Sequence, residues 1–151
     1  MINRFERFSF AISEIRRCWH KLAADELAKF EMNSPHAVYL NTLYQHEEGI
    51  TAARLAELCC KNKADVSRMV AIMEEKGIVE KEATGGNMYR ALIKLTEKGK
   101  IAAEHVRERA ALAVELAGAG LSDGDREIFY RALELITTNL QTLSKEGLPE
   151  K

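Results

Sequence analysis

The chain has 151 residues, of which 46% are hydrophobic and 30% charged, a balance typical of a soluble globular domain with its own core. No apolar run reaches the roughly 18 residues of a membrane span, and the charged N-terminus lacks the apolar segment of a signal peptide. We therefore expect a cytoplasmic protein with no membrane partner.

The charge distribution is uneven along the chain. The overall net charge is −1, but the middle third carries a net charge of +3 while the last third carries −3. A nucleic-acid contact is therefore expected in the middle of the chain.

The first predicted element is a long helix from Phe5 to about Phe30. Apolar residues recur along it at alternating steps of three and four, which is the spacing of one helix face. This stripe consists of Phe5, Phe8, Ile12, Ile15, Trp19 and Leu22.

A second helix is expected to have Ser34 as its N-cap, Pro35 at its first position and Gly49 at its end. Its expected apolar residues are Val38, Leu40, Leu43 and Tyr44.

Two short helices joined by a tight turn at Cys60-Lys61 are predicted for residues 51–76. Thr51 is expected to cap the first, which holds Leu55, Ala56 and Leu58. Asn62 is expected to cap the second, paired with Asp65 as in a capping box. The second helix has an apolar face at positions i, i+3, i+4 and i+7, formed by Val66, Met69, Val70 and Met73.

A β-hairpin is predicted next, with strands over 78–82 and 88–95 around a tip that contains Gly85 and Gly86. A fifth helix is expected from Thr96 to about Ala117, where Gly118 and Gly120 end it. A capping box at Ser122 opens a sixth helix. Its apolar residues repeat at steps of four and three, namely Phe129, Leu133, Ile136, Leu140 and Leu143.

This order predicts a mostly α fold with a small β-hairpin wing: a winged helix-turn-helix plus a helical dimerisation lobe. Residues 34–95 are expected to form the DNA-binding lobe, and residues 1–33 and 96–146 the dimerisation helices. A helix of this kind fits the major groove of B-DNA, and a hairpin can reach the adjacent minor groove.

Four segments of the chain resemble the MarR family of winged-helix regulators. They are Leu55-Ala56-Glu57-Leu58, Val66-Ser67-Arg68-Met69-Val70, Met73-Glu74-Glu75-Lys76-Gly77-Ile78-Val79 and Leu95-Thr96-Glu97-Lys98-Gly99. The resemblance implies a homodimer on a palindromic duplex operator, released by a small-molecule or redox trigger. The wing departs from the family pattern, which often has an Asp/Arg-rich tip, because Arg90 is the one charge near the tip here.

These features predict two sets of functional residues. The predicted DNA-binding residues are Thr51, Lys63, Ala64, Ser67, Arg68, Asn87 and Arg90. The predicted dimerisation residues are Phe5, Phe8, Ile12, Ile15, Phe129, Leu133, Ile136 and Leu140. Asp65 is interpreted as a helix cap rather than a reader of cytosine.

The function predicted is a sequence-specific transcriptional regulator, a repressor released by a small apolar or aromatic effector. One alternative is a winged-helix protein-interaction module without DNA binding, and another is a thiol-based redox sensor that uses Cys18. All three cysteines are interpreted as reduced thiols, with Cys59 in the core.

Neither an enzyme nor a cofactor protein is expected. The sequence has no phosphate-binding glycine loop, nucleophile elbow or pair of carboxylates on one loop. The four histidines lack the i, i+4 spacing of a helical zinc site, so no metal is expected.

Overall fold

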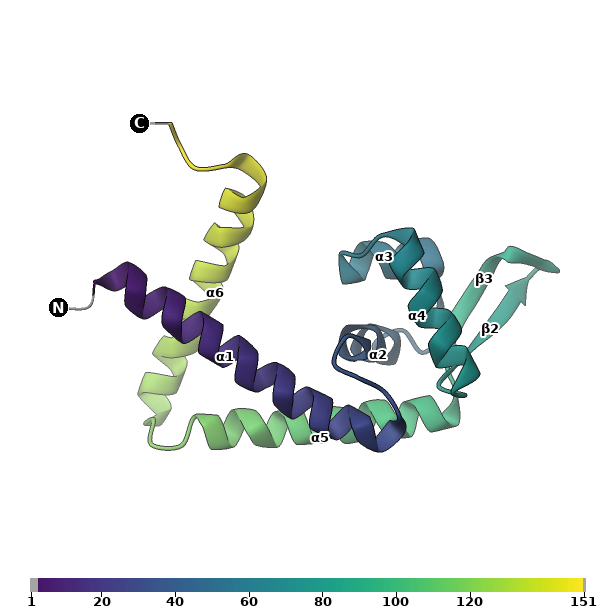
Figure 1. Cartoon of the computed structure of the whole chain (residues 1–151), viewed down its shortest axis with the longest axis horizontal. Coiled ribbons are helices and arrows are strands. Elements are labelled where there is room, and N and C mark those ends of the chain that lie inside the picture. The colour runs from purple at the N-terminus through teal and green to yellow at the C-terminus, as the bar shows by residue number, and fades with distance from the viewer. Residues whose placement is uncertain (1–2, 151) are drawn as a thin grey trace. The chain divides into compact units, whose positions relative to one another are not determined.

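The computed structural model describes residues 3–150, except for the side chains of residues 87–89 (Figure 1). The chain divides into two compact units, one ending at Ala111 and one beginning at Leu112. The elements are α1 (Arg4–Leu27), a 3₁₀ turn (Ala28–Phe30), α2 (His36–Tyr44), β1 (Ile50–Thr51), α3 (Ala52–Cys59), α4 (Lys63–Glu75), β2 (Val79–Thr84), β3 (Asn87–Leu95), α5 (Glu97–Ala117) and α6 (Asp123–Glu146). This order confirms the predicted mostly helical fold with a hairpin wing.

The hydrophobic core of the first unit is made of residues between Leu27 and Ala103. It includes the inner faces of α2, α3 and α4 and the base of the hairpin. The start of α5 closes it with two small residues, Ala102 and Ala103, which are at most 1% exposed. Since small side chains let backbones approach closely, α5 packs tightly on this core.

Gly99 marks the closest approach of α5 to the rest of the core. A Cβ atom at this position would lie 2.0 Å from the carbonyl oxygen of Ile78. Thr96 holds the same junction, because its hydroxyl donates to the carbonyl of Gly77 and accepts the N–H of Gly99. Close packing at Gly99 and the hydrogen bonds of Thr96 therefore explain why the Leu95–Gly99 segment contains these two residues.

The sheet has three antiparallel strands in the order β1-β3-β2. The hairpin strands β2 and β3 pair from Val79 opposite Leu95 to Thr84 opposite Asn87, with an irregularity between Glu82 and Thr84. In Figure 1 the hairpin extends beyond α4. The sequence reading missed β1, which pairs Ile50 with Ile93, because two residues are too few to show an alternation.

The predicted bounds of the second helix are wrong at both ends. Ser34 does not cap it, because α2 begins at His36 with Pro35 as N-cap and no side-chain cap bond. The helix ends at Tyr44, well before Gly49, and Gly49 instead adopts a positive φ of 90° on the way into β1. Just beyond the helix end, Nδ1 of His46 lies 2.8 Å from the carbonyl oxygen of Thr42, one of the last carbonyls of α2.

The predicted apolar faces of α2 and α3 need correction as well. Val38 and Leu58 are exposed, at 38% and 37%, whereas Tyr39 and Cys59 are buried in their place. On α4 the four predicted core residues are all buried.

The long helices α1 and α6 bury almost nothing within the chain. On α1 only Leu27 is buried, and on α6 no residue is. Ser122 caps α6 by accepting the N–H of Asp125, but the Asp125 carboxylate accepts the Ser122 hydroxyl rather than its backbone N–H, so the predicted capping box is only half formed. Among the described helices, none combines the length and apolarity that a bilayer crossing needs.

Glu26 fastens the end of α1 to α5 within the first unit. Its carboxylate pairs with Lys29, His105 and Arg109 at 2.7, 2.7 and 3.1 Å. The bonds from Lys29 and then from His105 lower the pKa of Glu26 to about 2.

Candidate nucleic-acid interface

Helix α4 has one buried face and one exposed face. Val66, Met69, Val70 and Met73 are at most 7% exposed and anchor the helix on the core. The opposite face is exposed and consists of Lys63, Ala64, Ser67, Arg68 and Ala71. We call this second set the α4 outer face. Because the anchored side is fixed by packing, the outer face is held in a defined orientation.

The turn before α4 forms as the sequence predicts. Cys60 adopts a left-handed conformation with a φ of 53°. The side chain of Asn62 then accepts the N–H of Asp65 at 2.8 Å and so caps the helix. The start of α4 therefore presents the partial positive charge of a helix N-terminus beside Lys63.

Asp65 does not act as the predicted second half of a capping box. Its Oδ2 accepts a hydrogen bond from the Tyr39 hydroxyl at 3.0 Å, and its Oδ1 accepts one from Nη2 of Arg68 at 2.5 Å. The Tyr39 bond, followed by the Arg68 pair, lowers the pKa of Asp65, which is a carboxylate at neutral pH. The cap comes from Asn62 alone, and Asp65 links the core to the α4 outer face.

Tyr39 is the residue of this arrangement that the sequence reading missed. It is 1% exposed, and its pKa is raised by burial and then by the bond to Asp65. His36, Tyr39, Leu40 and Leu43 are the buried residues of α2, and they follow the i, i+3, i+4, i+7 pattern. Counting tyrosine and histidine among the residues that can be buried would have revealed this face.

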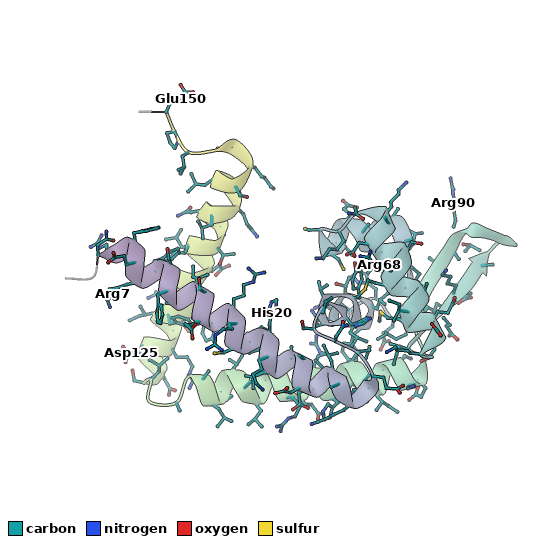
Figure 2. The ribbon with its side chains drawn as sticks, viewed as in Figure 1. Arg7, His20, Arg68, Arg90, Asp125 and Glu150 are labelled. Carbon is teal, nitrogen blue, oxygen red and sulfur yellow. The ribbon has the colours of Figure 1, made fainter. Side chains whose placement is uncertain are left out.

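The remaining predicted DNA contacts come from β1 and the wing. Thr51 is half-buried and caps α3, because its hydroxyl oxygen accepts the N–H of Arg54 at 3.2 Å. Arg90 is exposed, and Figure 2 shows its side chain projecting away from the hairpin. Asn87 lies at the start of β3, but its side chain is outside the described part of the structure.

The structure leaves all eight predicted dimerisation residues exposed. Their exposed fractions run from 38% for Ile136 to 71% for Phe5. Trp19, on the same stripe of α1, is also exposed, at 41%. These residues are available to a partner, and their role in dimerisation stays a prediction.

The cysteines differ in their surroundings. Cys59 is buried as predicted, with Sγ 3.5 Å from the Thr42 hydroxyl, and burial raises the pKa of its thiol. Cys18 is exposed on α1 with Sγ 3.7 Å from Nη2 of Arg17. Within the described residues, no three His, Cys, Asp or Glu side chains are grouped to hold a metal ion.

Comparison with known proteins supports the resemblance seen in the sequence. A model of the MarR family matches residues 32–87, the stretch from the start of α2 into the wing. The HTH-type transcriptional regulator YdcH of Bacillus subtilis is 27% identical over 93 residues, which span 60% of this chain and 63% of that protein.

Solved structures of similar fold match along almost the whole chain. A MarR transcriptional regulator from Methanosarcina mazei has a TM-score of 0.78 at 21% identity, covering 91% of this chain and 99% of its own. A Listeria monocytogenes MarR family regulator complexed with 26mer DNA has a TM-score of 0.74 at 19% identity, covering 93% and 95%. The Staphylococcus aureus MepR–DNA complex has a TM-score of 0.76 at 19% identity, covering 91% and 99%. The resemblance to MarR regulators is therefore confirmed, in the family match and in the fold.

Proposed function

We propose that the chain is a sequence-specific DNA-binding transcriptional regulator that acts as a homodimer. The observation that carries this proposal is the α4 outer face, in which Lys63, Ser67 and Arg68 stand exposed on a helix anchored by four buried residues. The similar folds of two regulators solved with DNA support it. We propose that the chain acts in the cytoplasm and is not an enzyme.

The α4 outer face suits the major groove for physical reasons. A helix fits this groove, where each base pair presents its own pattern of donors and acceptors. Arg68 can donate to a base edge, whereas Lys63 and the helix N-terminus can meet phosphates. Ala64 and Ser67 are small, so the helix can approach the bases closely.

The wing would add a second contact in the minor groove. Narrow minor grooves have a strongly negative potential that attracts arginine. Arg90 is exposed on β3 next to the hairpin tip, in a position to use this attraction. Thr51 and Asn87 would contribute polar contacts to the backbone of the duplex.

Dimerisation would be built from the exposed stripes of α1 and α6. Together they leave 15 large apolar side chains at least 38% exposed, seven from Phe5 to Leu22 and eight from Ile128 to Leu143. An apolar surface of this extent marks a protein interface on a soluble chain. A two-fold dimer would place two α4 helices about one DNA turn, roughly 34 Å, apart and so read a palindrome.

The regulator would act as a repressor that releases DNA when a small apolar or aromatic molecule binds. Such an effector must bind the DNA-free conformation better, since equal affinity for both states shifts nothing. Release of the operator by zinc or hydroperoxide, with no response to aromatic acids, would contradict this part of the proposal.

The decisive test is the substitution Arg68→Ala, measured on an operator selected from random duplexes or found upstream of the gene. We expect a loss of about 1–3 kcal/mol of binding free energy per half-site. Arg17→Ala is the matched control, because Arg17 is an exposed arginine on α1, outside the α4 outer face. Unchanged affinity in Arg68→Ala would remove α4 from the interface, and a wild-type chain that binds no duplex would point to a protein-interaction module.

The wing is tested by Arg90→Ala, with Arg17→Ala again as control. We expect modestly weaker binding, and a log–log salt slope lower by roughly 2 per dimer because each subunit loses one ionic contact. A slope equal to that of the wild type would show that the wing does not touch the duplex.

A further inference from the structure

Asp65 connects the core of the first unit to Arg68, an exposed cation of α4. On one side it accepts the hydrogen bond of Tyr39, a side chain that is 1% exposed. On the other side it pairs with Arg68, whose side chain is 69% exposed while that of Asp65 is 25% exposed. The three residues form a continuous path from a buried hydroxyl to the α4 outer face.

The direction of each bond in this path is fixed by chemistry. Asp65 is ionised at neutral pH, so both of its oxygens act as acceptors. Tyr39 keeps its proton, since burial and the adjacent carboxylate raise its pKa, and it therefore donates. Asp65 in turn holds an N–H of the Arg68 guanidinium, which is always charged.

This path limits the freedom of Arg68. A free arginine side chain has many rotamers and loses that entropy when it is ordered on DNA. Tyr39 is locked in the core, so Asp65 has a fixed site from which to hold Arg68. The bond at Nη2 leaves other N–H donors of the planar guanidinium for a ligand.

A held guanidinium is suited to one base in particular. Guanine presents two acceptors, N7 and O6, to the major groove, and arginine meets both when its plane is correctly oriented. A phosphate, in contrast, attracts any nearby cation whatever its orientation. The carboxylate of Asp65 also reduces the net charge at this point and so weakens indiscriminate attraction to phosphates.

We propose that Asp65, held by Tyr39, is a positioning residue that orients Arg68 to recognise a guanine in each operator half-site. The inference rests on the proposed function, and it assigns Asp65 to specificity rather than to helix capping. Tyr39 acts through Asp65 and does not touch DNA.

The experiment begins with a duplex sequence selected by the wild-type protein from a random pool. Affinities are then measured for that duplex, for versions with each half-site guanine replaced in turn, and for a scrambled duplex. The proteins are the wild type, Asp65→Asn, Tyr39→Phe, Arg68→Ala, Arg68→Lys and the double variant Asp65→Asn with Arg68→Ala. Glu74→Gln is the matched control, because it removes an exposed carboxylate from the same helix.

We expect Asp65→Asn to lower the ratio of selected to scrambled affinity by about tenfold, with scrambled affinity unchanged or higher. Tyr39→Phe should act in the same direction but more weakly, and Arg68→Lys should not restore the ratio because lysine cannot form the two-point contact. One guanine replacement should affect the wild type and leave Arg68→Ala indifferent. In the Arg68→Ala background, Asp65→Asn should change the ratio no further.

Three outcomes would overturn the inference while leaving DNA binding intact. The first is an Asp65→Asn ratio equal to that of the wild type or of Glu74→Gln. The second is an effect of Asp65→Asn that persists without Arg68, which would make Asp65 a direct reader. The third is a fall in thermal stability that accounts for the lost binding on both duplexes equally. A wild-type protein that binds no duplex would overturn this inference together with the proposed function.

Discussion

Helices α4 and α6 carry apolar residues at the same spacing of three and four, but the residues differ in burial. The four on α4 are at most 7% exposed, whereas the five on α6, from Phe129 to Leu143, are 38–46% exposed. The α1 stripe behaves like that of α6, with exposed fractions of 40% or more. The periodicity therefore shows that a helix face favours burial, and it does not show whether the same chain covers that face.

The most direct test of this difference is to place charged residues on the exposed apolar stripes of α1 and α6. We expect Ile12→Asp combined with Ile136→Asp to abolish the dimer and operator binding together, because the large interface inferred here tolerates no buried unpaired charge. Light scattering should report a mass near 17.0 kDa for the double variant and twice that for the wild type.

Two controls separate dimer loss from unfolding. Neither substituted residue is buried in the chain, so the far-ultraviolet dichroism of the double variant should remain helical. Thr138→Asp adds the same charge to an exposed position on the opposite side of α6 and should leave the mass unchanged. A wild-type mass near one chain at low micromolar concentration, with operator binding intact, would refute the dimer.

A second test compares the packed start of α5 with the exposed start of α6 by replacing one glycine in each. Gly99→Ala should lower the free energy of unfolding by about 3 kcal/mol, because the new methyl group collides with the Ile78 carbonyl, and backbone must move to relieve the collision. Gly124→Ala, in the first turn of α6, meets only the Ser122 hydroxyl oxygen at 3.9 Å and should raise it by about 0.5 kcal/mol. Urea unfolding followed by dichroism measures both, and similar effects at the two sites would show that α5 does not pack as described.

The fold was predictable because its elements are signalled locally. The caps at Thr51, Asn62 and Ser122 each have a side chain that accepts a backbone N–H within three residues, so sequence spacing identifies them. The hairpin tip at Gly85 and Gly86 needs the positive φ that glycine tolerates, and both residues adopt it.

The site was predictable only in part, because its geometry depends on contacts distant in sequence. Tyr39 and Asp65 are 26 residues apart, and nothing local distinguishes a capping aspartate from one that accepts a tyrosine hydroxyl. The burial of Tyr39 and His36 was missed for a related reason, since both residue types occur inside and outside proteins and carry a weak hydropathy signal.

The last test concerns His36, a histidine buried in the core of the first unit. It is 3% exposed, and its Nδ1 faces the backbone of Asn33 at 3.1–3.2 Å. Its Nε2 is buried and has no hydrogen-bond partner among the residues that the structure describes. Burial lowers the pKa of His36. The hydrogen bond to the Asn33 backbone acts in the opposite direction, and the positive charge of Lys76 lowers the pKa further. Between the folded pKa and the unfolded value of about 6.5, the unfolded chain therefore binds a proton that the folded chain does not.

The contribution of His36 to stability is thus fully present above about pH 6.5 and is lost as the pH falls through the folded pKa. We expect His36→Asn to lose less stability than the wild type between pH 7.5 and 5.5, because the asparagine Oδ1 can still accept the Asn33 N–H but the side chain cannot titrate. The difference in stability between the two proteins should be smaller than the effect of Gly99→Ala. His20→Asn, on the exposed face of α1, should follow the wild-type curve. Nitrogen-edited NMR of the imidazoles reports the protonation directly, and a His36 that titrates at or above 6.5 would mean that the α2 core is open to water. The contrast between a winged helix with a water-free core and the exposed apolar stripes of α1 and α6 would then no longer hold.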